Sequence, residues 1–229
     1  MKIKGYEKLS LVDYDLKIST TIFFGGCNFR CPFCHNSSLV ISPNDSPDIK
    51  KEEILDHLRK RRGMIDAVVI TGGEPTLEPN LKQFIREIKD MGYLVKLDTN
   101  GTNPNVLKDL VESNLIDYVA MDIKNSEAKY SLTTGVKVNF SNIKQTIDYL
   151  INSNIDYEFR TTVISEFHTL EDFVDISILL KGAKKMRIQK FIASENCINP
   201  DLHEVDEKLA NEFVKELKKT ISDVSLRGY

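Results

Sequence analysis

Three cysteines in one short stretch are the residues of this chain best suited to chemistry. Cys27, Cys31 and Cys34 lie in the sequence Gly-Cys-Asn-Phe-Arg-Cys-Pro-Phe-Cys-His-Asn, residues 26–36. Three thiolates on one loop can bind three corners of a cubic iron–sulfur cluster, whose usual protein complement is four cysteines. One iron is then left open to a small chelating molecule and can pass it an electron. The spacing therefore predicts a catalytic cluster.

Zinc and a redox dithiol are alternative interpretations of this stretch. The three cysteines and His35 supply a Cys3His set, but His35 directly follows Cys34, whereas zinc ligands are usually separated by two or more residues. Cys31-Pro-Phe-Cys34 has the spacing of a thioredoxin-type pair, which leaves Cys27 unexplained. Ligand geometry thus favours the cluster.

The fourth cysteine, Cys197, stands far from this stretch. No ligand spacing relates it to the other three, so we interpret it as an incidental thiol, with a role as a fourth ligand left open. Three bunched cysteines and one isolated cysteine do not form the disulfide framework of a secreted protein.

Size and charge limit the possible classes of protein. The chain has 229 residues and a mass of 26.1 kDa, so we predict a single domain over residues 1–229. The net charge is −3, so nothing suggests a general nucleic-acid binder, whose affinity would need a basic face. No apolar run could span a bilayer and the first residues lack the core of a signal peptide. We expect a cytoplasmic protein with no membrane partner.

Short β-branched runs alternate with amphipathic stretches along the chain. The runs predict strands at Ile18–Phe24, Ala67–Thr71, Tyr93–Thr99, Tyr118–Ile123, Tyr157–Val163 and Lys185–Phe191. Helical spacing of apolar residues predicts helices at Lys51–Arg62, Asn80–Met91, Asn105–Ser113, Asn142–Asn152, Leu170–Lys181 and Val205–Thr220. Strict alternation implies parallel strands joined by right-handed crossovers.

The number of β–α units is two short of a closed eightfold barrel. We therefore predict an α/β fold, an open partial (β/α)6 barrel with parallel strands, with a doubly wound sheet as the alternative. Thr169 and Asp172 have the spacing of a capping box, and Gly92 suits a left-handed helix end. Residues 125–140 are expected to be the longest irregular segment, and Ser225–Tyr229 an end strand.

Polar residues gather where the predicted strands end, which is where active sites lie in parallel α/β folds. The first strand runs into the cysteines. The next three strands end in Gly72-Gly73-Glu74, Asp98-Thr99 and Asp122-Ile123-Lys124, and the fifth carries Arg160. These residues are therefore candidates for one site.

The two glycines and the two aspartates each have a simpler interpretation as well. Gly72 and Gly73 would let backbone groups approach a ligand, or they form an ordinary turn. Asp98 and Asp122 could bind hydroxyl groups, ammonium groups or a hard cation. Helix capping is the alternative for both, although Asp98 lies several residues too early to cap the next helix.

The basic residues and histidines carry weaker signals. Lys124 and Arg160 could offset carboxylates in a pocket, or form surface pairs, which is the interpretation we adopt for Arg187. The remaining histidines, His57, His168 and His203, are interpreted as helix-surface or loop residues. His168 lies near a strand end and could face the pocket.

Two motifs of the chain resemble the radical S-adenosylmethionine superfamily: Cys-x3-Cys-x2-Cys and Gly-Gly-Glu-Pro. The segments 26–36, 98–101 (Asp-Thr-Asn-Gly) and 121–124 (Met-Asp-Ile-Lys) are similar to the glycyl-radical-enzyme activases. These include the activating enzymes of pyruvate formate-lyase and of anaerobic ribonucleoside-triphosphate reductase. Ser-Leu-Val-Asp-Tyr at residues 10–14 is most similar to the second kind.

This resemblance implies a set of ligands and their residues. A [4Fe–4S] cluster would be held by Cys27, Cys31 and Cys34, with His35 beside it as a non-ligand, and S-adenosylmethionine would chelate the fourth iron. The resemblance further implies roles for residues at the strand ends. The methionine moiety would be lined by Gly72, Gly73 and Glu74, a monovalent cation would be held by Asp98, Thr99 and Asp122, and Lys124 would lie beside them.

The resemblance also implies a reaction and partners. One-electron reduction by flavodoxin or ferredoxin would drive reductive cleavage of S-adenosylmethionine to a 5′-deoxyadenosyl radical, which removes hydrogen from a glycine of a partner glycyl radical enzyme. Anaerobic ribonucleoside-triphosphate reductase is the expected partner. The alternatives are a small-molecule enzyme such as a 7-carboxy-7-deazaguanine synthase-like cyclase, and a zinc- or cluster-binding module without catalysis.

Overall fold

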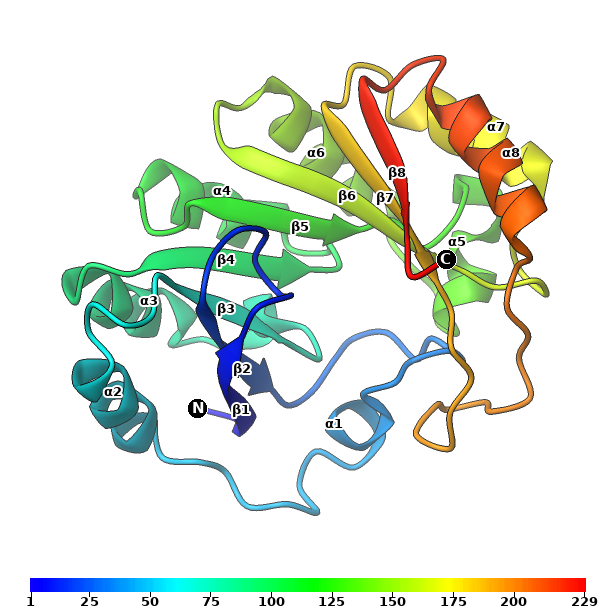
Figure 1. Cartoon of the computed structure of the whole chain (residues 1–229). Coiled ribbons are helices and arrows are strands. Elements are labelled where there is room, and N and C mark those ends of the chain that lie inside the picture. Colours follow the sequence, from blue (N-terminus) through cyan, green and yellow to red (C-terminus); the bar gives the residue numbers. More distant parts are fainter. The chain divides into compact units, whose positions relative to one another are not determined.

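Eight strands and eight α-helices follow one another in the computed structural model, which describes all 229 residues (Figure 1). The strands are β1 (Ile3–Ser10), β2 (Ser19–Phe24), β3 (Ala67–Gly72), β4 (Leu94–Thr99), β5 (Tyr118–Asp122), β6 (Asp156–Val163), β7 (Lys185–Lys190) and β8 (Asp223–Arg227). The helices are α1 (Ser37–Ile41), α2 (Lys51–Lys60), α3 (Leu81–Asp90), α4 (Pro104–Glu112), α5 (Glu127–Thr134), α6 (Phe140–Asn152), α7 (Leu170–Leu179) and α8 (Glu207–Leu217). The strand order is the chain order from β1 to β8, so the sheet is open, and the fold is the mostly parallel α/β sheet that was predicted.

Two units divide the chain. The first unit comprises residues Met1–Asn28, Ser38–Thr99 and Asn103–Ala120. The second unit comprises residues Phe29–Ser37, Asn100–Thr102 and Met121–Tyr229. The chain passes from one unit to the other within the cysteine stretch, after β4 and within β5. The single domain over residues 1–229 stays a prediction.

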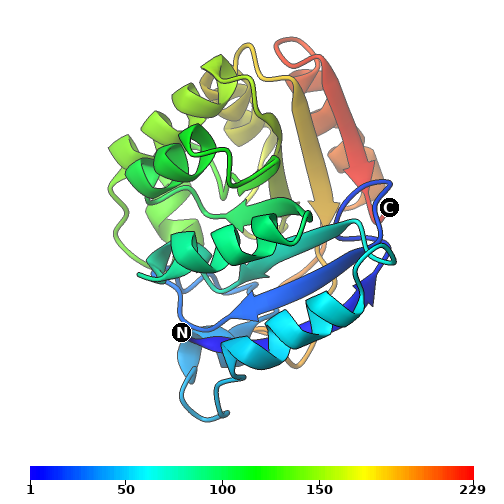
Figure 2. The same ribbon diagram turned by 90° about the vertical axis from the view of Figure 1, so that its left-hand side faces the viewer.

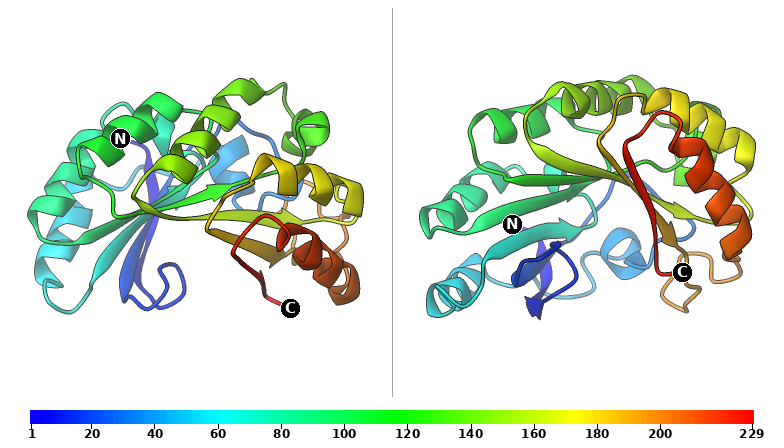
Figure 3. Two further views of the ribbon diagram at one scale, coloured as in Figure 1. Left: turned by 90° about the horizontal axis from the view of Figure 1, so that it is seen from above. Right: turned by 45° about the horizontal axis from the view of Figure 1, so that its top comes forward.

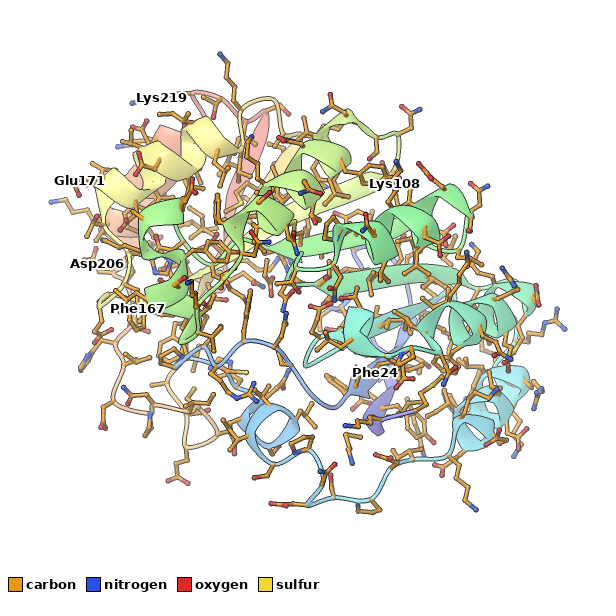
Figure 4. The ribbon with its side chains drawn as sticks, turned by 180° about the vertical axis from the view of Figure 1, so that it is seen from behind. Phe24, Lys108, Phe167, Glu171, Asp206 and Lys219 are labelled. Atoms are coloured by element: carbon orange, nitrogen blue, oxygen red, sulfur yellow. The ribbon has the colours of Figure 1, made fainter.

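In the first unit, parallel strands carry an almost continuous apolar sequence. β2, β3 and β4 pair in parallel, and β1 adds to β2 in the antiparallel direction. Val68, Val69 and Ile70 of β3 are fully buried, as expected for a parallel strand covered on both faces. Helices α2, α3 and α4 lie along one face of these strands (Figure 2). Phe24 of β2, which is labelled in Figure 4, packs against Phe84 of α3 with 6.2 Å between ring centroids.

In the second unit, β6, β7 and β8 form a parallel set covered by helices. Figure 3 shows α7 and α8 side by side, and the rings of Phe173 and Phe213 stack between them at 4.0 Å. Asp206 caps the start of α8 by accepting a hydrogen bond from the Leu209 N–H (Figure 4). These buried aromatic contacts fix the helices against the end of the sheet.

All the strands and helices predicted from the sequence are present, with ends that differ by a few residues. The predicted strands are β2 to β7, and the predicted end strand is β8.

The prediction of an irregular segment over residues 125–140 was wrong, because α5 and the start of α6 lie there. The α5 sequence contains serine and threonines of low helix propensity, and its helix is instead held by burial of Tyr130, Thr133 and Thr134. β1 was not predicted because charged residues interrupt its pattern.

Two predicted helix ends are confirmed. Asp172 accepts hydrogen bonds from the Thr169 N–H and hydroxyl, which makes the predicted capping box at the start of α7. Gly92 has a φ of 91° and its N–H donates to the Lys89 carbonyl, so the chain leaves α3 in the left-handed conformation that glycine adopts without strain.

The capping residue Asp172 also joins α7 to α5. Its buried carboxylate accepts from the Ser126 hydroxyl at 3.0 Å and pairs with the Lys129 ammonium at 2.6 Å. We predict that Asp172→Ala lowers the free energy of unfolding by about 2 kcal/mol, because it leaves these donors without an acceptor. Urea denaturation measures the change. Asp175→Ala, at an exposed position of the same helix, is the matched control, and an equal effect of both variants would contradict the prediction.

Candidate functional site

The cysteine stretch begins directly after β2, at the carboxyl end of a strand as predicted. Cys27 belongs to the first unit, whereas Cys31 and Cys34 belong to the second. None of the three forms a disulfide bond; Cys31 is buried and the other two are partly exposed. Gly26, with a φ of 90°, turns the chain out of β2, and its N–H donates to the Leu39 carbonyl at 2.7 Å.

The two glycines after β3 hold the start of the cysteine stretch by backbone contacts. The Gly73 N–H donates to the Phe24 carbonyl and the Glu74 N–H to the Gly26 carbonyl, both at 2.8 Å. A Cβ atom on Gly73 would lie 2.0 Å from the Gly26 oxygen, and one on Gly72 would lie 2.4 Å from the Phe24 backbone. Both positions therefore require glycine for a reason within the chain, and their contact with a ligand stays a prediction.

Glu74 joins the ends of β3 and β4. Its carboxylate is 2% exposed, and Oε1 accepts hydrogen bonds from the Thr76 N–H at 3.1 Å and from the Thr99 hydroxyl at 2.8 Å. The Thr76 hydroxyl donates to the same oxygen. These donors satisfy a buried carboxylate and fix the rotamer of Thr99. Glu74 and Thr99 are thus brought together as predicted neighbours.

Asp98 has a basic neighbour that the sequence analysis missed. The Lys96 ammonium lies 3.6 Å from Asp98 Oδ1, and the Thr71 hydroxyl donates to Oδ2 at 3.3 Å. Lys96 is 5% exposed. The signal was present in the sequence, because residues two apart in a strand share one face and Lys96 precedes Asp98 by two.

Asp122, Lys124 and Arg160 form one cluster in the second unit. Lys124 Nζ contacts Asp122 Oδ2 and Arg160 Nε contacts Asp122 Oδ1, each at 3.0 Å. Burial alone would raise the pKa of Asp122, but the two cations lower it from 3.8 to about 2. Burial alone would lower the pKa of Lys124, yet the Asp122 carboxylate and the Cys31 thiol keep it raised. The cluster is therefore fully ionised at neutral pH, with one net positive charge.

Cys31 and Cys34 lie close to this positive cluster. The Cys34 N–H donates to the Cys31 carbonyl at 3.0 Å, which closes a tight turn around Phe33. Phe33 packs against Phe167, which is labelled in Figure 4, with 6.4 Å between the ring centroids. The Lys124 ammonium lies 5.9 Å from the Phe33 ring centre. Burial raises the pKa of the Cys34 thiol, while Lys124 acts in the opposite direction. A nearby cation favours the thiolate form, which is the form that binds iron.

Two histidines of the second unit contact main-chain carbonyl groups through their rings. The His35 ring stacks on the Phe191 ring with 5.5 Å between their centroids, and His35 Nε2 lies 2.7 Å from the Ile192 carbonyl oxygen. His168 lies in the loop between β6 and α7, as interpreted, but it is 2% exposed and therefore does not lie at the surface. The Ile164 N–H donates to His168 Nδ1, and His168 Nε2 lies 3.0 Å from the Lys124 carbonyl. Burial lowers the pKa of His168, so the ring is neutral and holds the main chain at Lys124.

Cys197 lies beside the cysteine stretch rather than far from it. The Asn199 N–H donates to the Pro32 carbonyl at 2.7 Å, and Cys197 Sγ lies 4.0 Å from the Phe33 carbonyl. The thiol is 6% exposed. The sequence offered no signal for this proximity, because it arises from a long loop between β7 and α8. Arg187, in contrast, pairs with Asp223 as predicted, at 2.7 Å.

The donor set fits an iron–sulfur cluster. Three thiols without disulfide bonds lie within one stretch, and the two in the second unit lie near a fixed positive charge. Iron–sulfur clusters are bound by cysteine thiolates. The cysteines are therefore the residues that would hold the cluster.

Comparison with known proteins identifies the family. Residues 21–180 match the model of the radical SAM superfamily. A Methanocaldococcus jannaschii protein named "Putative glycyl-radical enzyme activating enzyme MJ1227" is 36% identical over 82% of this chain and 79% of its own length. A second protein of that organism, "Putative glycyl-radical enzyme activating enzyme MJ1632", is 26% identical over 97% of this chain and 86% of its own.

A solved structure agrees at the level of the fold. Streptococcus suis SuiB bound to S-adenosylmethionine has a TM-score of 0.69 at 12% identity, over 88% of this chain and 48% of that one. The chain has an open, mostly parallel α/β sheet, and its cysteine stretch follows the first parallel strand. It belongs to the radical SAM superfamily, and is a radical SAM enzyme whose cofactors are a [4Fe–4S] cluster and S-adenosylmethionine. Its helices include none of the length and apolar character that a membrane span requires.

Gly73 gives a direct test of how the cysteine stretch is held. We predict that Gly73→Ala lowers the iron content after anaerobic reconstitution severalfold, because the added methyl group would push the Gly26 carbonyl away from the segment that carries Cys27. Iron and sulfide analysis measures this. Gly63→Ala is the control, since a Cβ there meets nothing within 4 Å although its φ is also positive. Equal iron content in both variants would contradict the prediction.

The Asp122 cluster predicts a pH dependence of stability. Because the pKa of folded Asp122 lies below its ordinary value of 3.8, its ion pairs stabilise the fold above about pH 4 and lose that effect as the pH falls towards 2. We expect Asp122→Asn to lower the free energy of unfolding at neutral pH by about 1 to 3 kcal/mol, since Lys124 and Arg160 lose their counter-ion. Urea titrations at several pH values should show the difference from wild type shrinking in that acidic range. A difference independent of pH would refute this, and Asp223→Asn, at a more exposed pair, is the milder control.

Proposed function

We propose that this chain is a glycyl-radical-enzyme activase. The observation that carries the proposal is its 36% identity to a relative named as an activating enzyme, over about four-fifths of both chains. A second relative with the same kind of name matches almost the whole chain. Similarity of this extent, without a large unmatched region on either side, supports a common type of substrate.

The protein's own residues bind and orient the cofactors in this proposal. Cys27, Cys31 and Cys34 hold the [4Fe–4S] cluster, which when bound supplies the electron that cleaves S-adenosylmethionine to methionine and a 5′-deoxyadenosyl radical. Gly72, Gly73 and Glu74 line the methionine moiety. The remaining proposed cofactor contacts are Asp98, Thr99, Asp122, Lys124 and Arg160.

The charge of these residues suits that role. The pair of Lys124 and Arg160 around Asp122 has one net positive charge, which would attract the carboxylate of S-adenosylmethionine. Burial of Cys31 and Phe33 keeps water from that side of the cysteine stretch. No general base is needed, because the reaction on the partner is a hydrogen-atom transfer.

The proposed substrate is a glycine of a partner glycyl radical enzyme, and anaerobic ribonucleoside-triphosphate reductase is the proposed partner. The segment at residues 10–14, Ser-Leu-Val-Asp-Tyr, supports that choice through its resemblance to the activases of this reductase. A flavodoxin or ferredoxin is the proposed electron donor, because cluster reduction needs a one-electron carrier.

The test is radical formation on the partner. We expect the anaerobically reconstituted protein, given a one-electron donor and S-adenosylmethionine, to release 5′-deoxyadenosine and to produce a doublet in the electron paramagnetic resonance spectrum of the reductase. Cys31→Ala should lose the cluster and both signals, because three thiolates are needed. Cys197→Ala should keep both signals, because we interpret Cys197 as an incidental thiol outside the ligand set.

The controls separate activation from other radical SAM reactions. A reductase whose radical-bearing glycine is replaced by alanine should give no doublet. Release of 5′-deoxyadenosine without a doublet on any glycyl radical enzyme of the same organism would overturn the activase proposal and favour a small-molecule substrate. A colourless protein that binds one zinc ion would overturn the cluster itself.

A further inference from the structure

Lys96 is a buried lysine that the proposed chemistry does not use. It lies on β4 with 5% of its surface exposed. Its ammonium donates to the Asp13 carbonyl, lies 5.7 Å from the centre of the Tyr118 ring and lies 3.6 Å from Asp98 Oδ1. A lysine is seldom buried unless it is paired. These contacts fix the ammonium at one place beside Asp98.

Asp98 is therefore compensated by the chain itself. The Lys96 ammonium lies 3.6 Å from the buried Oδ1, which is an ion-pair distance and not a hydrogen bond, and the Thr71 hydroxyl donates to Oδ2 at 3.3 Å. A metal cation bound to this carboxylate would lie within a few ångströms of the Lys96 ammonium. At that separation the repulsion would weaken cation binding on the order of a hundredfold.

The other residues expected to hold a monovalent cation are also engaged. The Thr99 hydroxyl donates to Glu74 Oε1 at 2.8 Å. In the second unit, Asp122 has a separate cation on each oxygen, Lys124 and Arg160, both at 3.0 Å. Each carboxylate of the expected cation site thus has a cationic side chain within its own unit, and the residues do not fit an added monovalent cation.

We propose that Lys96 takes the place of the monovalent cation in this chain, holding Asp98 in position by a fixed ammonium group so that cleavage of S-adenosylmethionine needs neither sodium nor potassium. The inference rests on the proposed placement of S-adenosylmethionine beside Asp98. Lys96 is a positioning residue, because it acts through Asp98 and not on the reacting atoms. The hydrogen bond from the Lys96 ammonium to the Asp13 carbonyl links β4 to the turn between β1 and β2.

The first experiment measures the cation dependence of 5′-deoxyadenosine release by the reconstituted protein, without any partner enzyme. Sodium, potassium and choline chlorides are compared at equal ionic strength. We expect wild-type rates to agree within about twofold. The rate of 5′-deoxyadenosine release by Lys96→Met should be about tenfold below wild type in choline chloride. Sodium or potassium should restore most of that rate, since a small cation can then occupy the vacated position. Lys96→Arg keeps the charge and should stay independent of the cation.

The second experiment uses binding instead of activity. Sodium NMR line widths and thermal unfolding are measured in sodium and choline chlorides. We expect specific sodium binding, with a raised unfolding temperature, only in Lys96→Met. Lys82→Met, which removes a lysine paired with Asp109 at the surface, is the matched control and should behave as wild type.

The outcomes that would overturn the inference are distinct from failure of the activase proposal. A wild-type rate that falls about tenfold when choline replaces sodium and potassium would refute it. So would a Lys96→Met protein whose activity is unchanged in choline, or one that no salt restores. If Lys96→Met does not fold, the wild-type and Lys96→Arg measurements still decide. The assays need no glycyl radical enzyme, so a missing doublet on a partner leaves them unaffected.

Discussion

The approach of the Gly26 carbonyl to Gly73 is the constraint on which the cysteine stretch depends. The oxygen lies where a side chain of residue 73 would begin, and two backbone hydrogen bonds join the segments on either side. The direction in which the chain leaves β2, and hence where Cys27 lies, is set by the absence of one methyl group. Backbone contacts of this kind are rigid, because they have no rotamers to relax.

Charges near the candidate site are compensated pair by pair within each unit. Glu74 accepts hydrogen bonds from hydroxyl and amide donors, and Asp122 pairs with Lys124 and Arg160. Asp98 accepts a hydrogen bond from Thr71 and has the Lys96 ammonium 3.6 Å away as its counter-charge. Burying a charge without a partner is costly, so these pairs are a condition for placing carboxylates at the strand ends at all. The same pairs fix the orientation of these side chains within each unit, so that a ligand that binds them does not have to order them first.

The sequence predicted the α/β class and the strands β2 to β7, because long apolar runs and helical spacing are local signals. It failed at α5, whose helix depends on the burial of Tyr130 and on the tie between Lys129 and Asp172. It placed His168 correctly in a loop near a strand end, but it did not predict that the fold buries this ring against the Lys124 carbonyl. In each case a distant contact decided the outcome, and distant contacts leave no periodic pattern in the sequence.

The sequence by itself determined the chemistry of this protein. Three cysteines at this spacing supply three thiolates for a cluster, since covalent connection keeps them on one stretch, and backbone contacts such as that between Gly26 and Gly73 then hold the start of that stretch in place. The tertiary structure alone decided which charges compensate one another, through Lys96 beside Asp98 and Arg160 beside Asp122. Arg160 is separated from its partner by 38 residues, and only the pairing of strands brings such positions within contact distance. Coulomb interactions and burial act across space, so the pairing of charges could be seen only in the fold. The spacing of the cysteines is a property of the chain, so the sequence alone was enough to recognise it.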